Sequence, residues 1–209
     1  MDILSVQGLT FGYKDCPVFD NFSCNIKAGT ITRLAGINGA GKTTLLKCMT
    51  ALVNQGKCIY YKGTEIANKK SLLSSLSYAM SDDTLYDYLT VEENINFYRA
   101  LFQVGSSFTN EAFRILRLLK CDQYLDFLIK NLSQGTRSKV YTAICLAKPA
   151  EVYLLDEPFT ALDKQSQSFF CKYIQQIYLE QKKTFVLVTH IDEFQSLATD
   201  TIQIVKKEA

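Results

Sequence analysis

The hydrophobic positions of this chain form short apolar runs that alternate with longer segments of helical periodicity. Residues 152–156 and 184–189 are short apolar runs that each end in a polar residue, which is typical of strands buried on both faces of a parallel sheet. A third strand is predicted over Ile31–Ala35, followed by a glycine-rich loop and a helix over residues 42–52. Between the two buried runs, one face of a further helix is marked by Phe170, Tyr173, Ile174 and Ile177.

The middle of the chain, about residues 82–145, has a different pattern. Apolar residues recur at helical spacing, a second helix is predicted over residues 111–120, and no clear strand interrupts them. The positions at helical spacing are Val91, Ile95, Tyr98, Leu101 and Phe102. We therefore expect a helical insertion in an α/β domain whose strands and crossover helices form a mostly parallel sheet, covered on both faces.

Composition narrows the class of protein. The 209 residues fit one large domain or two small ones, and an apolar share of 47% is ordinary for a folded chain. A formal net charge of +2, spread along the chain, gives no support to nucleic-acid binding. The seven cysteines include no C-x-x-C pair, which argues against a zinc ribbon or a redox motif. Neither a signal peptide nor a membrane-spanning run is recognisable, so we expect a cytoplasmic chain.

The strongest motif is a phosphate-binding loop. Residues 36–43, Gly-Ile-Asn-Gly-Ala-Gly-Lys-Thr, match G-x-x-x-x-G-K-[ST] between a predicted strand and a predicted helix. Glycines let backbone N–H groups converge on phosphate oxygens, and the helix dipole favours negative charge there. Lys42 supplies positive charge for the β- and γ-phosphates, and Thr43 offers a hydroxyl ligand for Mg²⁺. The predicted nucleotide site comprises Gly36, Ile37, Asn38, Gly39, Ala40, Gly41, Lys42, Thr43 and Thr44.

Two adjacent carboxylates, Asp156 and Glu157, end the buried run that begins at Val152. Because an uncompensated carboxylate beside a core is costly, this placement favours a cation or a proton-transfer role. Asp156 suits the Mg²⁺ shell, and Glu157 suits the base that polarises an attacking water. His190, the only histidine, follows the next buried run, and parallel strands deliver their carboxyl ends to the edge where ligands bind. We predict Glu157 and His190 as the catalytic residues.

A polar turn at residues 131–137 precedes a helix predicted over residues 139–147. Ser133 and Gly135, at a helix N-terminus, could form an anion site or an ordinary cap. On local sequence alone, the cap is the preferred interpretation.

The order of phosphate loop, Leu-Ser-x-Gly, Asp-Glu and lone histidine resembles, over the whole chain, the nucleotide-binding domain of ABC transporters. Residues 132–135, Leu-Ser-Gln-Gly, are similar to the family signature, with Gln134 and Thr136 as departures. Residues 155–163 are similar to the Walker B strand and the D-loop, and His190 matches the switch histidine.

The resemblance implies a P-loop NTPase fold in a single ABC ATPase domain, residues 1–209. Its parts are a mostly parallel sheet core, an N-terminal antiparallel β portion, and a helical subdomain inserted at about residues 82–145. ATP and Mg²⁺ are the implied ligands. Tyr13 is the aromatic residue that would stack on adenine, with Phe11 as second choice.

The resemblance also implies partners. In a homodimer, or in a pair with a related ABC subunit, ATP would be sandwiched between one subunit's phosphate loop and the other's turn of Ser133 and Gly135. The helical insertion would dock a separate transmembrane permease, which would place the chain at the cytoplasmic face of the membrane. The run from Leu155 to Lys164 is similar to the haem-export ATPase of cytochrome c biogenesis, and small peptide- or antibiotic-export ATPases are nearly as similar. We therefore expect an exporter.

One position departs from the family pattern in a way that affects chemistry. Ser81 stands where a glutamine normally reaches Mg²⁺ and the attacking water, and serine is too short to reach as far. Asp82 or Asp83 could contact the metal instead, or a water could bridge the gap. We expect Ser81→Gln to raise the basal ATPase rate.

A soluble ABC protein without a permease, such as an iron–sulfur assembly ATPase, is the alternative from a different class. A nucleotide-binding regulator that hydrolyses ATP slowly is a further one, which Ser81 keeps open. Proteins of the family that read nucleic acid carry tandem cassettes, a long coiled coil or a basic surface, and none of these is found here.

Overall fold

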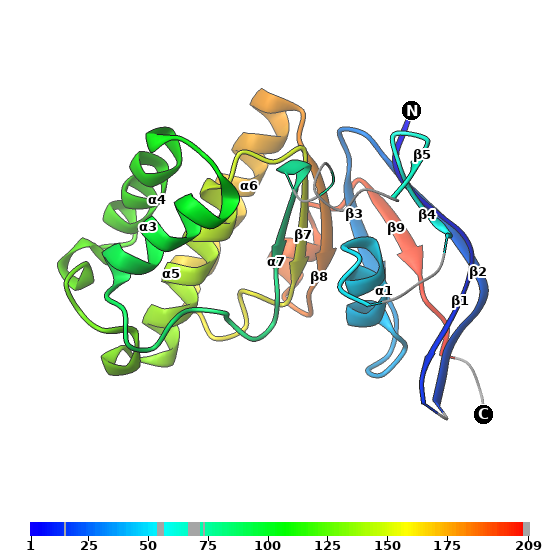
Figure 1. The fold of residues 1–209 in the computed structure, drawn as a ribbon, viewed down its shortest axis with the longest axis horizontal. Helices are drawn as coiled ribbons and strands as arrows, with labels where there is room; N and C mark the ends of the chain where they lie inside the picture. Colours follow the sequence, from blue (N-terminus) through cyan, green and yellow to red (C-terminus); the bar gives the residue numbers. More distant parts are fainter. Residues whose placement is uncertain (15, 54–56, 67–71, 73, 207–209) are drawn as a thin grey trace.

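The N-terminal part of the chain forms an antiparallel sheet, which Figure 1 shows in blue and cyan at one end of the molecule. In this sheet β1 (Asp2–Tyr13) pairs with β2 (Cys16–Lys27) and with β4 (Ile59–Tyr61), and β5 (Thr64–Glu65) follows β4. The predicted N-terminal antiparallel β portion is thereby confirmed. The computed structural model describes residues 1–14, 16–53, 57–66, 72 and 74–206.

A five-stranded parallel sheet in the order β6-β7-β8-β3-β9 forms the centre of the fold. Every residue of β7 and β8 is buried, because both faces of the sheet are covered. The three predicted strands are confirmed, although β8 ends one residue earlier than expected. The strands are β3 (Ile31–Ala35), β6 (Leu76–Ala79), β7 (Val152–Asp156), β8 (Thr184–Val188) and β9 (Asp200–Gln203).

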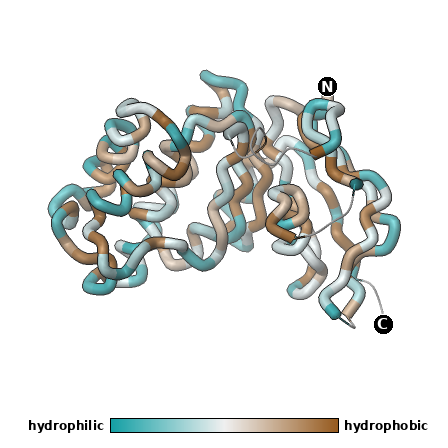
Figure 2. The backbone as a smooth tube through the Cα atoms, in the orientation of Figure 1, coloured by the Kyte–Doolittle hydropathy of each residue, from teal (hydrophilic) through white to brown (hydrophobic). Residues whose placement is uncertain are grey.

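One face of the parallel sheet packs against α1 (Lys42–Met49) and the antiparallel sheet. Val152 and Leu154 of β7 join Leu45 of α1 in this core. The helix is shorter than the predicted 42–52, because the Thr50 hydroxyl donates to carbonyl oxygens of the last turn and Ala51 has a φ of 54°. Figure 2 shows hydrophobic stretches along these central strands and hydrophilic ones at the outer turns.

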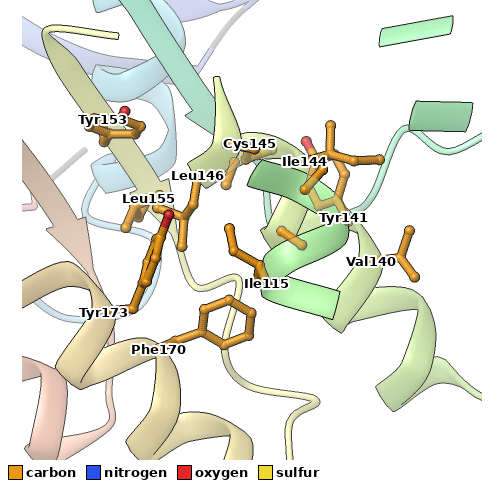
Figure 3. Packing of buried hydrophobic residues seen from close by; sticks show 14 of the residues in the cluster. Ile115, Val140, Tyr141, Ile144, Cys145, Leu146, Tyr153, Leu155, Phe170 and Tyr173 are labelled. Atoms are coloured by element: carbon orange, nitrogen blue, oxygen red, sulfur yellow. The ribbon is translucent and has the colours of Figure 1, made fainter. Parts of the chain in front are cut away.

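The opposite face of the sheet is covered by α5 (Gln134–Ala147) and α6 (Lys164–Gln181). Tyr153 and Leu155, which alternate with the residues of the first core, point to this side. Figure 3 shows Phe170 and Tyr173 of α6 among the side chains packed here. The four residues predicted to form the buried face of α6 are all buried, which confirms that prediction.

The helical insertion consists of α3 (Val91–Phe102), α4 (Ser106–Leu118) and α5, with two short 3₁₀ turns before α5. Figure 1 shows these helices in green and yellow-green at the end opposite the antiparallel sheet. Ile95 and Ile115 belong to the same hydrophobic core as Tyr153 of the sheet, so the insertion packs directly on the central layer. Within the described ranges, no helix combines the length and the apolar character that crossing a lipid bilayer requires.

Three details of the insertion differ from the sequence predictions. The helix α4 begins at Ser106, not at residue 111, and ends two residues earlier than predicted. The helix α5 begins at Gln134, not at residue 139, because Ser133 caps it. Leu101, which shares the helical spacing of its neighbours in α3, is 59% exposed.

Candidate active site

The glycine-rich loop of residues 36–41 joins the carboxyl end of β3 to the N-terminus of α1. Gly41 has a φ of 102°, and a Cβ there would lie 2.6 Å from Cγ1 of Val18 on β2. A Cβ on Gly36 would lie 2.5 Å from the carbonyl oxygen of Ile204, which follows β9. Close packing at both ends therefore fixes the path of the loop.

Lys42 is the first residue of α1 and is only 8% exposed. Its Nζ donates hydrogen bonds to the carbonyl oxygens of Gly36 at 2.8 Å and of Ile37 at 3.0 Å. The ammonium group thus lies within the curve of the loop, where its burial favours an anionic ligand. No side chain caps the N-terminus of α1, so the positive end of the helix dipole faces the same space.

Asp156 is the last residue of β7 and is 1% exposed. Thr43 donates its hydroxyl to Oδ1 at 3.1 Å, and Tyr78 of β6 donates its hydroxyl to Oδ2 at 3.3 Å. Burial raises the pKa of the Asp156 carboxyl, and the two hydroxyl donors act in the opposite direction. The arrangement sets a hydroxyl and a carboxylate oxygen side by side at the carboxyl edge of the sheet.

Glu157 turns the chain away from β7 with a φ of 54°, a conformation that non-glycine residues rarely adopt and that is often found at functional sites. Its N–H donates to the carbonyl oxygen of Val188 at 2.9 Å, which joins the ends of β7 and β8. His190 lies two residues after Val188, and its Nε2 lies 3.0 Å from Oε1 of Glu157. The structure therefore brings the two predicted catalytic side chains into contact.

A cavity of about 470 Å³ lies among these groups, a size typical of small-molecule sites. Val18 and Val188 add apolar surface to it. The other predicted loop residues do not line it: Gly36 packs near Ile204, Ile37 is 67% exposed and Ala40 is buried. The predicted site residues that line this cavity are Tyr13, Asn38, Gly39, Gly41, Lys42, Thr43, Thr44, Glu157 and His190.

Two aromatic residues of β1 were possible partners for a nucleotide base. Tyr13 lines the cavity and is 46% exposed. Phe11 does not line the cavity, and its ring packs edge-on against Tyr13 with the centroids 5.1 Å apart. The geometry favours Tyr13, as the sequence did.

Ser133 and Gly135 lie away from this cavity. The Ser133 hydroxyl accepts the N–H of Thr136 at 3.2 Å and so caps α5. A Cβ on Gly135 would lie 3.3 Å from the carbonyl oxygen of Ala161, so the turn packs closely on the segment after Glu157. Within one chain the turn is a helix cap and does not line this cavity.

A second cavity, of about 600 Å³, also contacts Glu157 and is lined by Ser81, Asp82 and Asp83 among others. Both carboxylate oxygens of Asp83 accept hydrogen bonds from Arg137, from Nε at 3.0 Å and from Nη2 at 2.8 Å. A guanidinium group therefore engages both oxygens of Asp83. Asp82 lines the same cavity, and the roles of Asp82, Asp83 or a bridging water near Ser81 stay predictions.

Sequence reasoning missed Tyr78 and Arg137. Tyr78 is a hydroxyl-bearing residue on the short strand β6. The partner of its hydroxyl depends on which strand pairs with β6. Arg137 lies in the turn that resembles the family signature, but its carboxylate partners are about fifty residues away. Neither contact has a local sequence signal.

Comparison with known proteins identifies the family. A profile of the ABC transporter family matches residues 19–160. The chain is 32% identical to the iron(3+)-hydroxamate import ATP-binding protein FhuC of Bacillus subtilis, over 91% of this chain and 74% of that one. It is 29% identical to the phosphonates import ATP-binding protein PhnC of Fusobacterium nucleatum, over 98% and 89% respectively. It is 28% identical to the ergothioneine transport ATP-binding protein EgtV of Helicobacter pylori, over 97% of both chains.

Solved structures share the fold. The dimeric structure of MJ0796, a bacterial ABC transporter cassette, superposes with a TM-score of 0.87 at 21% identity, over 97% of this chain and 94% of that one. An ATP-binding subunit of an ABC transporter gives the same TM-score at 20% identity, over 99% and 88%. Fold and site together define a P-loop ABC ATPase. The chain belongs to the ABC transporter family, among its ATP-binding subunits.

Proposed function

We propose that this chain is the ATP-hydrolysing motor of an ABC transporter and that it works as a dimer on a separate membrane permease. The observation that carries the proposal is that Lys42, Thr43, Glu157 and His190 line the same cavity. A buried ammonium group, an uncapped helix N-terminus and a carboxylate that contacts a histidine all face one space. Such an arrangement can bind a polyphosphate and activate a water molecule beside it.

The mechanism follows from these positions. Lys42 would exchange its hydrogen bonds to the loop carbonyl oxygens for bonds to the β- and γ-phosphates of ATP, and Tyr13 would stack on adenine. Glu157 would accept a hydrogen bond from the attacking water and take its proton. The water oxygen bonds to the γ-phosphorus while the bond to the β–γ bridging oxygen breaks, which yields ADP and phosphate. His190 would hold the Glu157 carboxylate in place through their 3.0 Å contact.

Thr43 and Asp156 fit a Mg²⁺ ion bound together with the nucleotide. Mg²⁺ in nucleotide sites uses one or two protein oxygen ligands, phosphate oxygens and water, and not a cage of side chains. The described part of the chain contains no group of three or more His, Cys, Asp or Glu residues able to hold a metal. The ion would neutralise charge that develops on the β- and γ-phosphates.

The dimer is proposed because one chain lacks part of the expected nucleotide contact. Ser133 and Gly135 resemble residues that contact ATP, yet they do not line the phosphate-loop cavity of their own chain. A second copy, or a related ABC subunit, could present this turn to that cavity. The similar MJ0796 cassette is dimeric, which supports the arrangement.

The permease and the direction of transport belong to the same proposal. A similar solved structure is an ATP-binding subunit of an ABC transporter, which supports a motor that works with further transporter subunits. The separate permease and the place at the cytoplasmic face of the membrane rest on the sequence resemblance. The sequence resemblance predicted an exporter of the haem type. FhuC and PhnC are import proteins, so these relatives support a transporter motor but give no support to haem export. We further propose that residues 1–209 act as one ABC ATPase domain with residues 82–145 as its helical subdomain.

Co-purification from membranes tests the proposal. The tagged chain, extracted in mild detergent from its source membranes, should retain one integral membrane protein, and the complex should hydrolyse ATP. Measuring uptake or release by vesicles that contain the complex then decides the direction of transport. Recovery of a soluble partner in place of a membrane protein would favour an ABC ATPase without a permease, such as an iron–sulfur assembly protein. Absence of ATP turnover would favour a nucleotide-binding regulator.

A further inference from the structure

The strands β6 and β7 are parallel neighbours, with Tyr78 opposite Leu154. Leu154 and Asp156 are two residues apart and therefore lie on the same face of β7. Side chains in strands lean along the strand direction, so the Tyr78 ring can extend toward the carboxyl end of its neighbour. Its hydroxyl reaches Oδ2 of Asp156 at 3.3 Å. The pairing register of two strands thus brings a tyrosine hydroxyl to the buried carboxylate.

The two oxygens of Asp156 have different kinds of partner. Oδ1 accepts the hydroxyl of Thr43, which lines the phosphate-loop cavity and is itself a proposed Mg²⁺ ligand. Oδ2 accepts the hydroxyl of Tyr78, which lines neither of the two cavities beside Glu157. Like Tyr78, Asp156 lines neither cavity, so the Tyr78 hydroxyl meets the site through its hydrogen bond to this buried carboxylate.

We propose that Tyr78 is a positioning residue that orients the Asp156 carboxylate for Mg²⁺ of the Mg-nucleotide complex. The inference rests on the proposed function, in which Asp156 and Thr43 contact the ion. Hydrogen-bond partners of metal-ligating carboxylates fix their orientation, and their removal typically lowers metal affinity 10- to 100-fold. Because the hydroxyl–carboxylate distance of 3.3 Å is longer than the usual O–H···O range of about 2.5–3.0 Å, we expect an effect at the lower end, about tenfold.

Calorimetry of Tyr78→Phe separates this role from general packing. Phenylalanine keeps the ring in the core and removes only the hydroxyl. The affinity for ATP is measured twice, in excess EDTA and in excess Mg²⁺, and the ratio gives the gain due to the ion. We expect the variant to match the wild type in EDTA and to lose about tenfold of the gain from Mg²⁺. Mn²⁺ binding to the ATP complex, followed by electron paramagnetic resonance, should weaken by a similar factor.

Tyr153→Phe is the matched control. Tyr153 lies on β7 with Asp156, is buried, and donates its hydroxyl to the carbonyl oxygen of Lys148, away from the site. This variant should leave both nucleotide affinities unchanged, and thermal unfolding of the two variants shows how much stability each hydroxyl provides.

Four results would overturn the inference. A Tyr78→Phe protein with the full gain from Mg²⁺ would show that the hydroxyl does not orient Asp156. Equal losses in EDTA and in Mg²⁺ would indicate a general structural role. A wild-type protein that binds ATP but gains nothing from Mg²⁺ would remove the ion from the site, whereas a wild-type protein without any affinity for ATP would refute the proposed function as well.

Discussion

The carboxyl edge of the parallel sheet and the loop that enters the helical insertion each border a cavity that Glu157 also lines, but they hold their charged groups differently. At the sheet edge, Lys42 and Asp156 are almost fully buried, and their partners are backbone carbonyl oxygens and hydroxyl groups. At the insertion, Arg137 is tied to Asp83 and Asp87 by ion pairs whose side chains are 20% to 51% exposed. The first region is organised within one chain. The second is held by partly solvated charges. Its turn of Ser133 and Gly135 does not line the phosphate-loop cavity of the same chain.

This difference indicates where substitutions act. Buried polar contacts are costly to disturb, whereas ion pairs near the surface contribute modestly. We therefore expect changes at the sheet edge to affect stability and nucleotide binding strongly. Breaking ion pairs at the insertion should have smaller effects on stability, because the hydrophobic core that the insertion shares with the sheet still holds its helices in place.

The largest effect is expected from Gly41→Ala. The new Cβ would clash with Val18 and would hold an alanine at a φ of 102°, so both the loop and its contact with β2 must shift. We expect a loss of about 2–3 kcal/mol in the free energy of unfolding, measured with urea, and a loss of ATP binding. Gly63→Ala is the control, because Gly63 has a φ of 77° but no atom near its Cβ position. Equal losses in both variants would show that packing against β2 is unimportant.

An intermediate effect is expected from breaking the pair of Arg137 and Asp83. The two hydrogen bonds from one guanidinium to one carboxylate favour an interaction, but partial exposure reduces it to about 1 kcal/mol. A double-mutant cycle with Arg137→Met and Asp83→Asn, followed by urea unfolding, measures the coupling. A coupling above about 3 kcal/mol would mean that this ion pair contributes as much to stability as a buried one. That result would contradict the difference between the two regions.

The smallest effect on stability, with a change in rate, is expected from Ser81→Gln. Ser81 lines the larger cavity beside Glu157, so a longer amide there has room to approach the water and the ion. We expect unchanged unfolding and a basal ATPase rate raised by about twofold to tenfold, a fraction of what a positioned catalytic group supplies. An unchanged or lower rate in the purified protein would show that the serine does not limit turnover.

The sequence predicted those features that depend on neighbouring residues. The phosphate loop is one continuous motif, and β7 and β8 are buried on both faces, so their apolar runs are unambiguous. Helix starts were harder. The first residues of α4 are mostly polar, so the apolar pattern does not mark the start of the helix. Phe108 can be assigned to the buried face of α4 only when the helix is known to begin after Gly105.

Contacts between distant segments could not be predicted. The hydrogen bond of Tyr78 to Asp156 depends on the register of β6 against β7, which the sequence does not specify. The ion pair of Asp83 with Arg137 spans 54 positions. The positive φ of Glu157 accompanies its hydrogen bond to Val188, on a strand that comes later in the chain.

The most direct test of the central claim is a paired measurement on Glu157→Gln. If the phosphate loop binds ATP and Glu157 acts as the base for its hydrolysis, this variant should bind Mg-ATP as well as the wild type in calorimetry. Its turnover should fall by about 10²- to 10⁴-fold. Glu151→Gln, which makes the same change at a residue next to the other end of β7, should leave both quantities unchanged. Full turnover by Glu157→Gln, or no affinity of the wild type for Mg-ATP, would contradict the account.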